Sequence, residues 1–345
     1  MLTLEGYTIK ELSQQSGQFS LYKGIRNADE MPVVLKVCQS DRSAALSDIV
    51  AIQHEYEILK HLNLSSVIKV YDLIKTHDRL VLVLEDIGGT SLQQYLSNGP
   101  VSLSDFFKLT LQLVDAIGEL HLQNITHKDI NPNNILINTE NLTIKLADFG
   151  ISSELTQENQ ENRSLHNLQG SLSYYSPEQT GRMNRSVDYR SDFYSLGVTL
   201  YEMLAGKLPF DSQDTLELVH LHLTAVPESL TSSNPDIPLV IEDIIFKLLS
   251  KMPESRYKSA AGLRADILLC QEQWEKNKSI ERFAVGKSDL QDHLTISPKL
   301  YGREDQFAIL LDKFNSVSKG NSELVFVSGY SGIGKTAGVS FKVCK

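Results

Sequence analysis

The chain has 345 residues, enough for one large domain with a further segment or for two domains of ordinary size. Hydrophobic residues make up 41% of the sequence and charged residues 22%, which is typical of a globular protein and excludes wholesale disorder. The formal net charge of −10 argues against a broad grip on nucleic acid or on anionic lipid.

The sequence shows no membrane or secretion signal. It has no run of about 18 apolar residues, so no membrane insertion is expected. The first residues, MLTLEGYTIKEL, lack a basic segment followed by an apolar core and do not resemble a secretory leader. Cys38, Cys270 and Cys344 are far apart in sequence, which favours a reducing, cytoplasmic location without disulfides or a zinc site.

The N-terminal part of the chain is predicted to form mainly strands, and the part after it mainly helices. Short β-branched runs between polar residues indicate the strands GYTIKEL, SLYKGIR, PVVLKVC, VIKVYDLI and RLVLVLED. One helix is expected among them, around Ser47–Leu62. From Ser102 the pattern becomes helical, with Asp105 three residues later as in a capping box. The apolar residues of this helix are Phe106, Leu109, Leu113, Ile117 and Leu120, and further helices are expected at 192–204, 239–251 and 260–276.

Three consecutive segments are predicted from these patterns. Residues 7–275 contain the strand-rich and helix-rich parts and are expected to form one domain. Residues 276–299 are polar and weakly patterned, which indicates a linker. Residues 300–345 then begin again as a helix, a strand and a glycine-rich turn.

The strongest functional signal is the segment HKDINPNN at 127–134, followed by LADFG at 146–150. Phosphoryl transfer needs a carboxylate that orients or accepts the proton of the attacking hydroxyl, and oxygen ligands that hold Mg²⁺ against the phosphates. Asp129 suits the first role, and Asn134 and Asp148 suit the second as metal ligands. The stretch ILINTENLTIKLADF alternates like a hairpin, which predicts that Asp148 folds back beside Asn134.

Together these motifs resemble the eukaryotic-type serine/threonine protein kinase family. HKDINPNN is similar to the family pattern H-R-D-L-K-P-x-N, and Asp148 begins the DFG motif. The motif SPE, which ends at Glu178, stands where the family has A-P-E, and Arg256 matches the arginine that pairs with that glutamate. Asp192 matches the aspartate that anchors the catalytic loop. The resemblance implies an α+β protein-kinase fold with a β-rich small lobe and a helical large lobe, and ATP and Mg²⁺ as cofactors.

The small lobe supplies Lys36 on the strand VVLKV, and this residue matches the family lysine that holds the α- and β-phosphates. An arbitrary lysine on a strand would more often lie in solvent. Helical spacing selects the acidic partner, because Glu55 shares one face with Ile52 and Leu59. Glu57 lies about 200° around the helix from Glu55 and is expected to face away. The predicted catalytic residues are Asp129, Lys36 and Glu55.

The segment LVLVLEDIGG at 80–89 resembles the hinge that contacts adenine in this family. Leu84 would be the gatekeeper, and backbone groups from Glu85 to Ile87 would face the base. The same residues are also consistent with an ordinary strand that ends in a glycine turn. The resemblance implies a nucleotide site formed by Gly17, Leu21, Val34, Lys36, Leu84, Glu85, Ile87, Asn134 and Asp148.

Several features depart from the family pattern, among them Lys128, which replaces the arginine before Asp129 and keeps its charge without its bidentate geometry. The phosphate-covering loop QQSGQFSL has Gln14, Ser16 and Phe19 where the family has glycines, and only Gly17 remains near its tip. Glycine matters there because a Cβ hinders the approach of backbone N–H groups to phosphate. Asn131 replaces the family lysine that touches the γ-phosphate, so this position can donate a hydrogen bond but brings no charge.

The segment GYSGIGKT at 329–336 fits the P-loop pattern G-x-x-x-x-G-K-[ST] and follows the strand ELVFVS. Gly334, Lys335 and Thr336 would bind phosphate and Mg²⁺ there. Only nine residues follow Thr336, too few for the helix and the acidic strand of a working ATPase, so 300–345 is expected to be an N-terminal fragment of an AAA-type P-loop domain. This order of segments resembles the N-terminal part of large bacterial hybrid sensors, which join a serine/threonine kinase, an AAA-type ATPase, GAF modules and a histidine kinase.

The first functional hypothesis is an ATP- and Mg²⁺-dependent protein kinase that acts on Ser and Thr hydroxyls of protein substrates in bacterial signal transduction. The resemblance also implies two-component signalling proteins as partners, and no nucleic acid. The alternative is a pseudokinase, a nucleotide-binding module that regulates a partner, which the missing glycines and Asn131 favour. A third hypothesis is an adaptor that acts through its C-terminal fragment.

Overall fold

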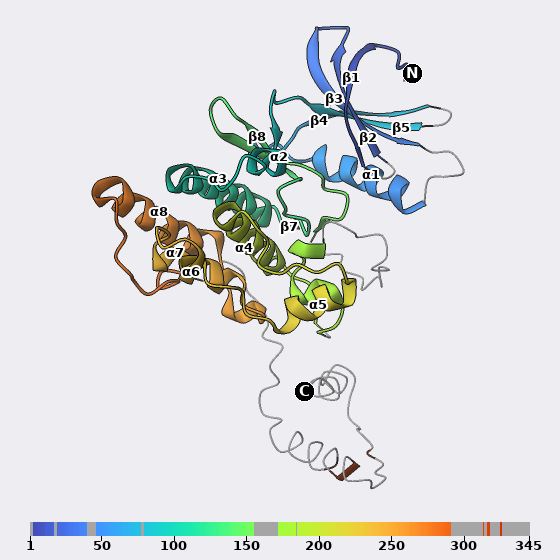
Figure 1. Cartoon of the computed structure of the whole chain (residues 1–345). Coiled ribbons are helices and arrows are strands. Elements are labelled where there is room, and N and C mark those ends of the chain that lie inside the picture. Colours follow the sequence, from blue (N-terminus) through green and yellow to red (C-terminus); the bar gives the residue numbers. More distant parts are fainter. Residues whose placement is uncertain are drawn as a thin grey trace. The chain divides into compact units, whose positions relative to one another are not determined.

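The computed structural model divides the chain into two units, Met1–Leu290 and Gln291–Lys345 (Figure 1). In the first unit it describes residues 3–16, 19–39, 46–76, 79–154, 172–183 and 185–290. In the second it describes only Lys313, Ser316, Val317 and Val325, and the first three of these are helical. The account below concerns the first unit.

A five-stranded antiparallel sheet forms the small lobe, in the strand order β1-β2-β3-β5-β4 (Figure 1). Its strands are β1 (Tyr7–Ser16), β2 (Phe19–Arg26), β3 (Met31–Gln39), β4 (Val70–Lys75) and β5 (Arg79–Glu85). All five coincide with β-branched runs of the sequence, as predicted.

The two faces of strand β3 have different tasks. Val33, Leu35 and Val37 are buried in a small apolar cluster with residues of β5, on one face of the sheet. Lys36 and Cys38 alternate with them, so they point to the opposite face, where Cys38 joins the main core. This alternation aims the lysine at the interior of the domain and not at solvent.

Helix α1 (Leu46–Leu59) packs against β3, β4 and β5 of the sheet. Ile52, Glu55 and Leu59 are 0%, 1% and 2% exposed, so they form the inward face that the spacing predicted. The side chain of Glu57 is 59% exposed and pairs with Lys60 on the surface. The helix therefore carries a single buried carboxylate toward the sheet among its described side chains.

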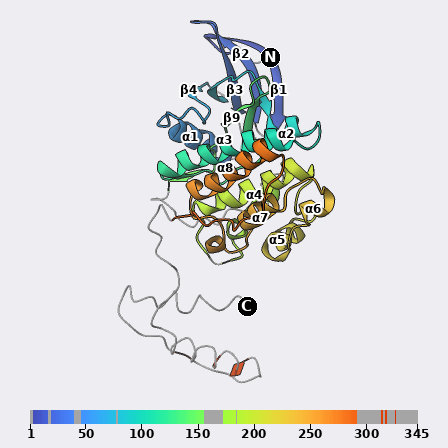
Figure 2. The ribbon, with the colours of Figure 1, turned by 90° about the vertical axis from the view of Figure 1, so that its left-hand side faces the viewer.

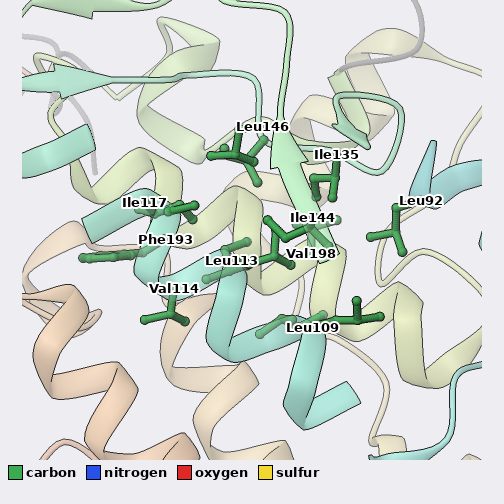
Figure 3. Packing of buried hydrophobic residues seen from close by; sticks show 14 of the residues in the cluster. Leu92, Leu109, Leu113, Val114, Ile117, Ile135, Ile144, Leu146, Phe193 and Val198 are labelled. Atoms are coloured by element: carbon green, nitrogen blue, oxygen red, sulfur yellow. The ribbon is translucent and has the colours of Figure 1, made fainter. Parts of the chain in front are cut away.

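The large lobe is built around helix α3 (Leu103–Leu122), and Figures 1 and 2 show its helices on the other side of the unit from the sheet. Ser102 caps α3 by accepting a hydrogen bond from the N–H of Asp105, which confirms the predicted capping box position. The apolar residues expected on this helix are all fully buried, at 0% exposure. Figure 3 shows Leu109, Leu113 and Ile117 of α3 in one cluster with Phe193 and Val198.

The predicted helices α4 (Arg190–Ala205), α7 (Leu239–Leu248) and α8 (Ala260–Asn277) surround α3 in the core or pack on one another. Helices α2 (Leu92–Leu96), α5 (Thr215–Thr224) and α6 (Leu230–Ser233) were not predicted, because all three are short and lack a sustained helical period. Short 3-10 turns lie at Leu172–Tyr174, Pro177–Thr180 and Pro253–Ser255.

The remaining short strands form two small sheets, β6-β8-β9 and β10-β7. Strands β8 (Ile135–Asn138) and β9 (Thr143–Leu146) form the predicted hairpin, and β6 (Thr90–Ser91) adds to its edge. Strand β7 (Ile125–Thr126) pairs with β10 (Ser153–Glu154), so the segment after the hairpin returns to the segment that precedes the loop HKDINPNN. These two pairings set the positions of the loops that carry the site.

After α8 the chain continues as a strap that packs on the large lobe, within the range for which a linker was expected. The Asp289 carboxylate accepts hydrogen bonds from the backbone N–H of Lys258 at 2.7 Å and of Ser259 at 3.1 Å. The N–H of Gly286 donates to Asp266 of α8 at 2.6 Å. Residues 278–290 are thus attached to the first unit, while the limits of the three predicted segments stay a prediction.

A buried ion pair joins the motif SPE to Arg256, which lies between α7 and α8 in the sequence. Arg256 donates to both carboxylate oxygens of Glu178, at 2.6 and 2.7 Å, and both side chains are 0% exposed. The guanidinium also donates to the carbonyl groups of Ser250, Lys251 and Arg190. The expected contact between Glu178 and Arg256 is therefore present, with the charge fully enclosed in hydrogen bonds.

Removing the charge of Glu178 should destabilise the domain strongly, since it leaves a buried guanidinium without its counter-ion. We expect Glu178→Gln to lower the free energy of unfolding by about 3–5 kcal/mol in urea denaturation. Asp115→Asn is the matched control, because Asp115 pairs with Arg264 at the surface, where the side chains are 46% and 44% exposed. That control should cost less than about 1 kcal/mol, and equal losses in the two variants would contradict the expectation.

Candidate active site

Three side chains from separate elements meet at the small-lobe side of the site. The Nζ of Lys36 on β3 lies 2.7 Å from Oε2 of Glu55 on α1 and 3.1 Å from Oδ1 of Asp148, which follows β9. Lys36 is only 7% exposed. One ammonium therefore links the sheet, the helix and the DFG motif, and its partner on α1 is Glu55 and not Glu57, as the helical spacing predicted.

The two carboxylates decide the charge of this lysine. Burial by itself lowers the pKa of Lys36, but Asp148 and Glu55 outweigh it and raise that pKa above its usual value. Partial removal of solvent opposes ionisation of Asp148, whose side chain is still 46% exposed, yet the Lys36 ammonium holds the pKa of that carboxyl below its usual range. Burial raises the pKa of Glu55, and the adjacent ammonium opposes the rise. Lys36 and Asp148 are thus both charged at neutral pH.

Asp192 on α4 stabilises the loop HKDINPNN through hydrogen bonds to its backbone. Its carboxylate accepts hydrogen bonds from the backbone N–H of His127 at 2.9 Å and of Lys128 at 2.8 Å, and from the ring of His121 at 2.9 Å. Lys128 has a φ of 67°, a conformation that side chains other than glycine adopt at a cost. The fully buried carboxylate offsets that cost by fixing both N–H groups.

His127 connects the same loop to the DFG motif. Its Nδ1 accepts from the N–H of Asp129 at 3.3 Å, and its Nε2 donates to the carbonyl of Ala147 at 3.2 Å. Burial lowers the pKa of His127, so the ring is neutral, which agrees with one donating and one accepting nitrogen. The ring also packs against Phe149, with 4.5 Å between the centroids.

Asparagine amides contact the Asp129 carboxylate on both of its oxygens. Nδ2 of Asn131 lies 2.9 Å from Oδ1, and Nδ2 of Asn134 lies 3.0 Å from Oδ2. Asn134 also donates to the backbone carbonyl of Asp129 at 2.9 Å. The carbonyl of Asn134 in turn accepts from the N–H of Ala147 at 2.9 Å, one residue before Asp148. The hairpin therefore brings Asp129, Asn134 and Asp148 into adjacent positions.

The oxygen atoms here fit a hard divalent cation. The side chain of Asp148 is 46% exposed, although one of its oxygens faces Lys36, so part of the carboxylate is accessible to a ligand. Asn134 uses its amide nitrogen toward Asp129, which directs its oxygen elsewhere. In the described part of the chain no three His, Cys, Asp or Glu side chains form a metal cluster. Mg²⁺ is commonly held by one or two protein oxygens together with substrate phosphates.

Comparison with known proteins now gives this arrangement a family. The protein kinase domain model matches residues 15–268, which is most of the chain and contains every contact of the site described above. The chain belongs to the protein kinase family. A second model, of an AAA ATPase domain, matches residues 299–340.

The relatives include kinases from bacteria and a hybrid histidine kinase. Serine/threonine-protein kinase PrkC of Bacillus subtilis (strain 168) is 31% identical over 262 residues, covering 76% of this chain and 40% of that protein. Hybrid signal transduction histidine kinase G of Dictyostelium discoideum is 30% identical over 332 residues, covering 71% of this chain and 10% of that protein. Serine/threonine-protein kinase PknB of Mycobacterium leprae (strain TN) is 30% identical over 241 residues, covering 68% and 38%. The chain spans less than half the length of each of them.

The segment predicted to be the hinge contacts residues of β8 and β9. Leu84 is 7% exposed and pairs in register with Val34 of β3. The side chain of Glu85 contacts Lys145 at 2.7 Å, and the backbone N–H of Glu85 donates to the carbonyl of Lys69 at 2.9 Å. Asn138 donates to the carbonyl of Ile87 at 3.1 Å. Leu21, which pairs with Lys36 across β2 and β3, is half-buried beside the same face of the sheet.

The glycine-poor loop contributes an aromatic ring where the family has a glycine. The Phe19 ring centroid lies 4.9 Å from Nζ of Lys36, a cation–π contact at the start of β2. Gln14 lies on β1 opposite Leu21. Gly17 lies outside the described residues, as do Gly334, Lys335 and Thr336 of the predicted P-loop.

Two contacts of the site were not predicted from the sequence. Nε2 of His54 lies 2.7 Å from the carbonyl of Ser152, so α1 is bonded to the segment after the DFG motif. Nε2 of the Gln179 amide donates to the carbonyl of Lys128 at 2.8 Å. Both join residues that are far apart in the chain, and a single sequence carries no periodic signal for such side chain to backbone bonds.

Asp192→Asn should weaken the domain in a pH-dependent way. Burial raises the pKa of Asp192, but its hydrogen bonds from His121 and the loop backbone outweigh this and lower it below the ordinary value. A lowered pKa stabilises the fold above the unfolded value of about 3.9, and this contribution is lost as pH falls further toward the folded value. We therefore expect the stability difference between wild type and variant to be large at pH 7 and to shrink below about pH 4.

Thermal unfolding between pH 3 and pH 7 measures this difference. Asp115→Asn serves again as the exposed control, and it should change stability by less than about 1 kcal/mol at either pH. A difference between wild type and Asp192→Asn that stays constant across the range would show that the charge of Asp192 plays no part.

Proposed function

We propose that this kinase transfers the γ-phosphate of ATP to Ser and Thr hydroxyls of protein substrates, in bacterial signal transduction. The observation that carries the proposal is the position of Lys36, whose Nζ lies 2.7 Å from Glu55 and 3.1 Å from Asp148. The segment of Asp148 is in turn hydrogen-bonded to the loop that contains Asp129. Bacterial relatives that bear the name serine/threonine-protein kinase support the choice of acceptor.

In this proposal the small lobe binds the nucleotide. Lys36 would hold the α- and β-phosphates, and Glu55 would keep its ammonium in place through the buried ion pair. Adenine would lie against the hinge, where the resemblance to the family implies that backbone groups from Glu85 to Ile87 face the base. The residues proposed to line this pocket are Gly17, Leu21, Val34, Leu84, Glu85 and Ile87.

The large lobe would supply the metal ligands and the base. Asp148 and Asn134 would hold Mg²⁺ through oxygen, and the ion would neutralise phosphate charge when bound. Asp129 would accept the proton of the attacking hydroxyl, since a carboxylate oriented by two amides is suited to that task. Charge neutralisation and alignment, with no covalent intermediate, are what phosphoryl transfer asks of a protein.

A pseudokinase remains the second candidate, and one observation favours it. The Phe19 ring lies against the Lys36 ammonium, in the region that phosphates would have to share. With Gln14 and Ser16 in place of glycines, backbone N–H groups have less freedom to cover those phosphates. Such a protein would bind nucleotide, and regulate a partner, with little phosphate transfer.

The wider organisation is also part of the proposal. We infer a kinase domain at 7–275, a linker at 276–299 and a fragment of an AAA-type P-loop domain at 300–345, with phosphate-binding roles for Gly334, Lys335 and Thr336. The AAA match to residues 299–340 supports the third segment. None of the described helices has the length and apolar character to cross a bilayer. A cytoplasmic location and two-component signalling partners belong to this proposal as well.

Loss of the proposed base should abolish transfer. We expect Asp129→Asn to lower kcat by about 10²–10⁴-fold, because the attacking hydroxyl loses its proton acceptor. The measurement is transfer of labelled phosphate from ATP to the protein itself and to a generic basic acceptor protein. Asn133→Ala, an exposed change in the same loop, should keep wild-type activity. Wild-type transfer no higher than that of Asp129→Asn would refute the kinase and favour the pseudokinase.

Nucleotide binding should depend on Mg²⁺ through Asp148. ATP with Mg²⁺ should raise the thermal unfolding midpoint of the wild type, because a ligand that binds only the folded state stabilises it. Removal of Mg²⁺ with EDTA, or the variant Asp148→Asn, should remove most of this shift, since both take away a ligand–metal contact. Asp115→Asn at the exposed pair with Arg264 is the control and should keep the wild-type shift, and a shift that survives in Asp148→Asn would overturn the metal assignment.

A further inference from the structure

The position that breaks the family pattern in the catalytic loop is buried and not directed at solvent. Asn131 is 2% exposed, and its Nδ2 lies 2.9 Å from Oδ1 and 3.1 Å from the backbone carbonyl of Asp129. A lysine at this position could extend toward a phosphate, whereas this short amide ends on the carboxylate two residues before it. The residue therefore acts within the loop.

A third residue fixes which way the Asn131 amide faces. Its Oδ1 accepts a hydrogen bond from the backbone N–H of Asn133 at 3.0 Å. An oxygen must face that N–H, so the NH₂ end must face Asp129. The amide thus bridges Asn133 and Asp129. Its orientation is determined by the backbone N–H of Asn133, which remains when the side chain at this position is replaced by that of alanine.

Together with Asn134 this bridge contacts the two carboxylate oxygens from different directions. Asn131 donates to Oδ1 at 2.9 Å, and Asn134 donates to Oδ2 at 3.0 Å. Two donors on two oxygens fix the plane of the carboxylate, since rotation about its terminal bond would break at least one of the bonds. Either amide alone would leave that rotation less restricted.

We propose that Asn131 is a positioning residue that sets the orientation of the Asp129 carboxylate, and that it has taken this role in place of the phosphate-contacting role of a lysine. This rests on the proposed function of Asp129 as base. In the step concerned, the acceptor hydroxyl oxygen bonds to the γ-phosphorus, the bond from phosphorus to the ADP oxygen breaks, and Asp129 takes the hydroxyl proton. ADP leaves with the bonding electron pair.

Orientation matters in this step because the carboxylate must point a lone pair at one hydroxyl proton. A misplacement of about 1 Å can cost on the order of 10²-fold in rate. The amide also carries no charge, so it holds the carboxylate without the electrostatic effect that an ammonium would have on its basicity. Asn131 should therefore affect the chemical step more than ATP binding.

Two variants separate the donor from the acceptor of the Asn131 amide. Asn131→Ala removes both, whereas Asn131→Asp keeps an oxygen for the Asn133 N–H but replaces the donor by a second carboxylate beside Asp129. We expect Asn131→Ala to lower kcat by about 10–100-fold with KM for ATP within about twofold. Asn131→Asp should shift the acidic limb of the pH dependence of kcat/KM upward by about one pH unit or more, because like charges disfavour a second ionisation.

Asn133→Ala is the matched control, since it removes an exposed amide from the same loop and keeps the backbone N–H. It should leave kcat and the pH profile unchanged. A kcat within twofold of wild type in Asn131→Ala, or an unmoved acidic limb in Asn131→Asp, would overturn the positioning role. A merely structural residue would lower the amount of folded protein, which thermal unfolding reports, without moving the acidic limb.

Hydrogen exchange tests the bridge independently of catalysis. The amide hydrogen of Asn133 should exchange faster in Asn131→Ala, which lacks its acceptor, and at the wild-type rate in Asn131→Asp, which retains it. Equal exchange in wild type and Asn131→Ala would refute the bridge. If wild-type protein transfers no more phosphate than Asp129→Asn, the proposed function fails and with it the role in catalysis, while the exchange comparison still decides whether Asn131 holds the loop.

Discussion

The arrangement of the site depends on one buried ammonium that two carboxylates share. Lys36 belongs to the sheet, Glu55 to helix α1 and Asp148 to the segment after the hairpin. An oxygen of each carboxylate lies within 3.1 Å of the Lys36 Nζ. Burying a charge is costly unless it is paired, so both carboxylates stabilise the charged form of the lysine. The ion pairs thereby join the small lobe, α1 and the DFG motif.

Two buried carboxylates stabilise the large lobe, one by binding backbone groups and the other by binding a side chain. Asp192 binds two consecutive N–H groups of the catalytic loop, and Glu178 binds the guanidinium of Arg256 with both oxygens. Both carboxylates replace water by fixed hydrogen bonds. Those of Asp192 stabilise a backbone conformation of the loop that the chain would not adopt alone, as the positive φ of Lys128 indicates. The conformation of the loop HKDINPNN is therefore stabilised by the buried Asp192 of α4.

Two of the departures from the family pattern acquire different meanings once the contacts are known. In sequence, Asn131 is a lost charge and Phe19 a lost glycine. In the structure, the amide of Asn131 is bonded to the Asp129 carboxylate, and the Phe19 ring lies 4.9 Å from the Lys36 ammonium. Both residues thus contact groups proposed to act in phosphate transfer, so each departure changes the surroundings of a site residue and does not merely remove a family feature.

The sequence by itself determined the strands of the small lobe, the long helices, the hairpin and the choice of Glu55, because each follows from a local period of two or about 3.6 residues. The pairing of Glu178 with Arg256 also came from motifs in a fixed order. The tertiary structure alone decided the short helices, the packing of residues 278–290 and the bond from His54 to Ser152, 98 residues away. It also decided the orientation of Asn131. These features depend on which backbone groups meet across the fold, and a local pattern along one chain does not contain that information.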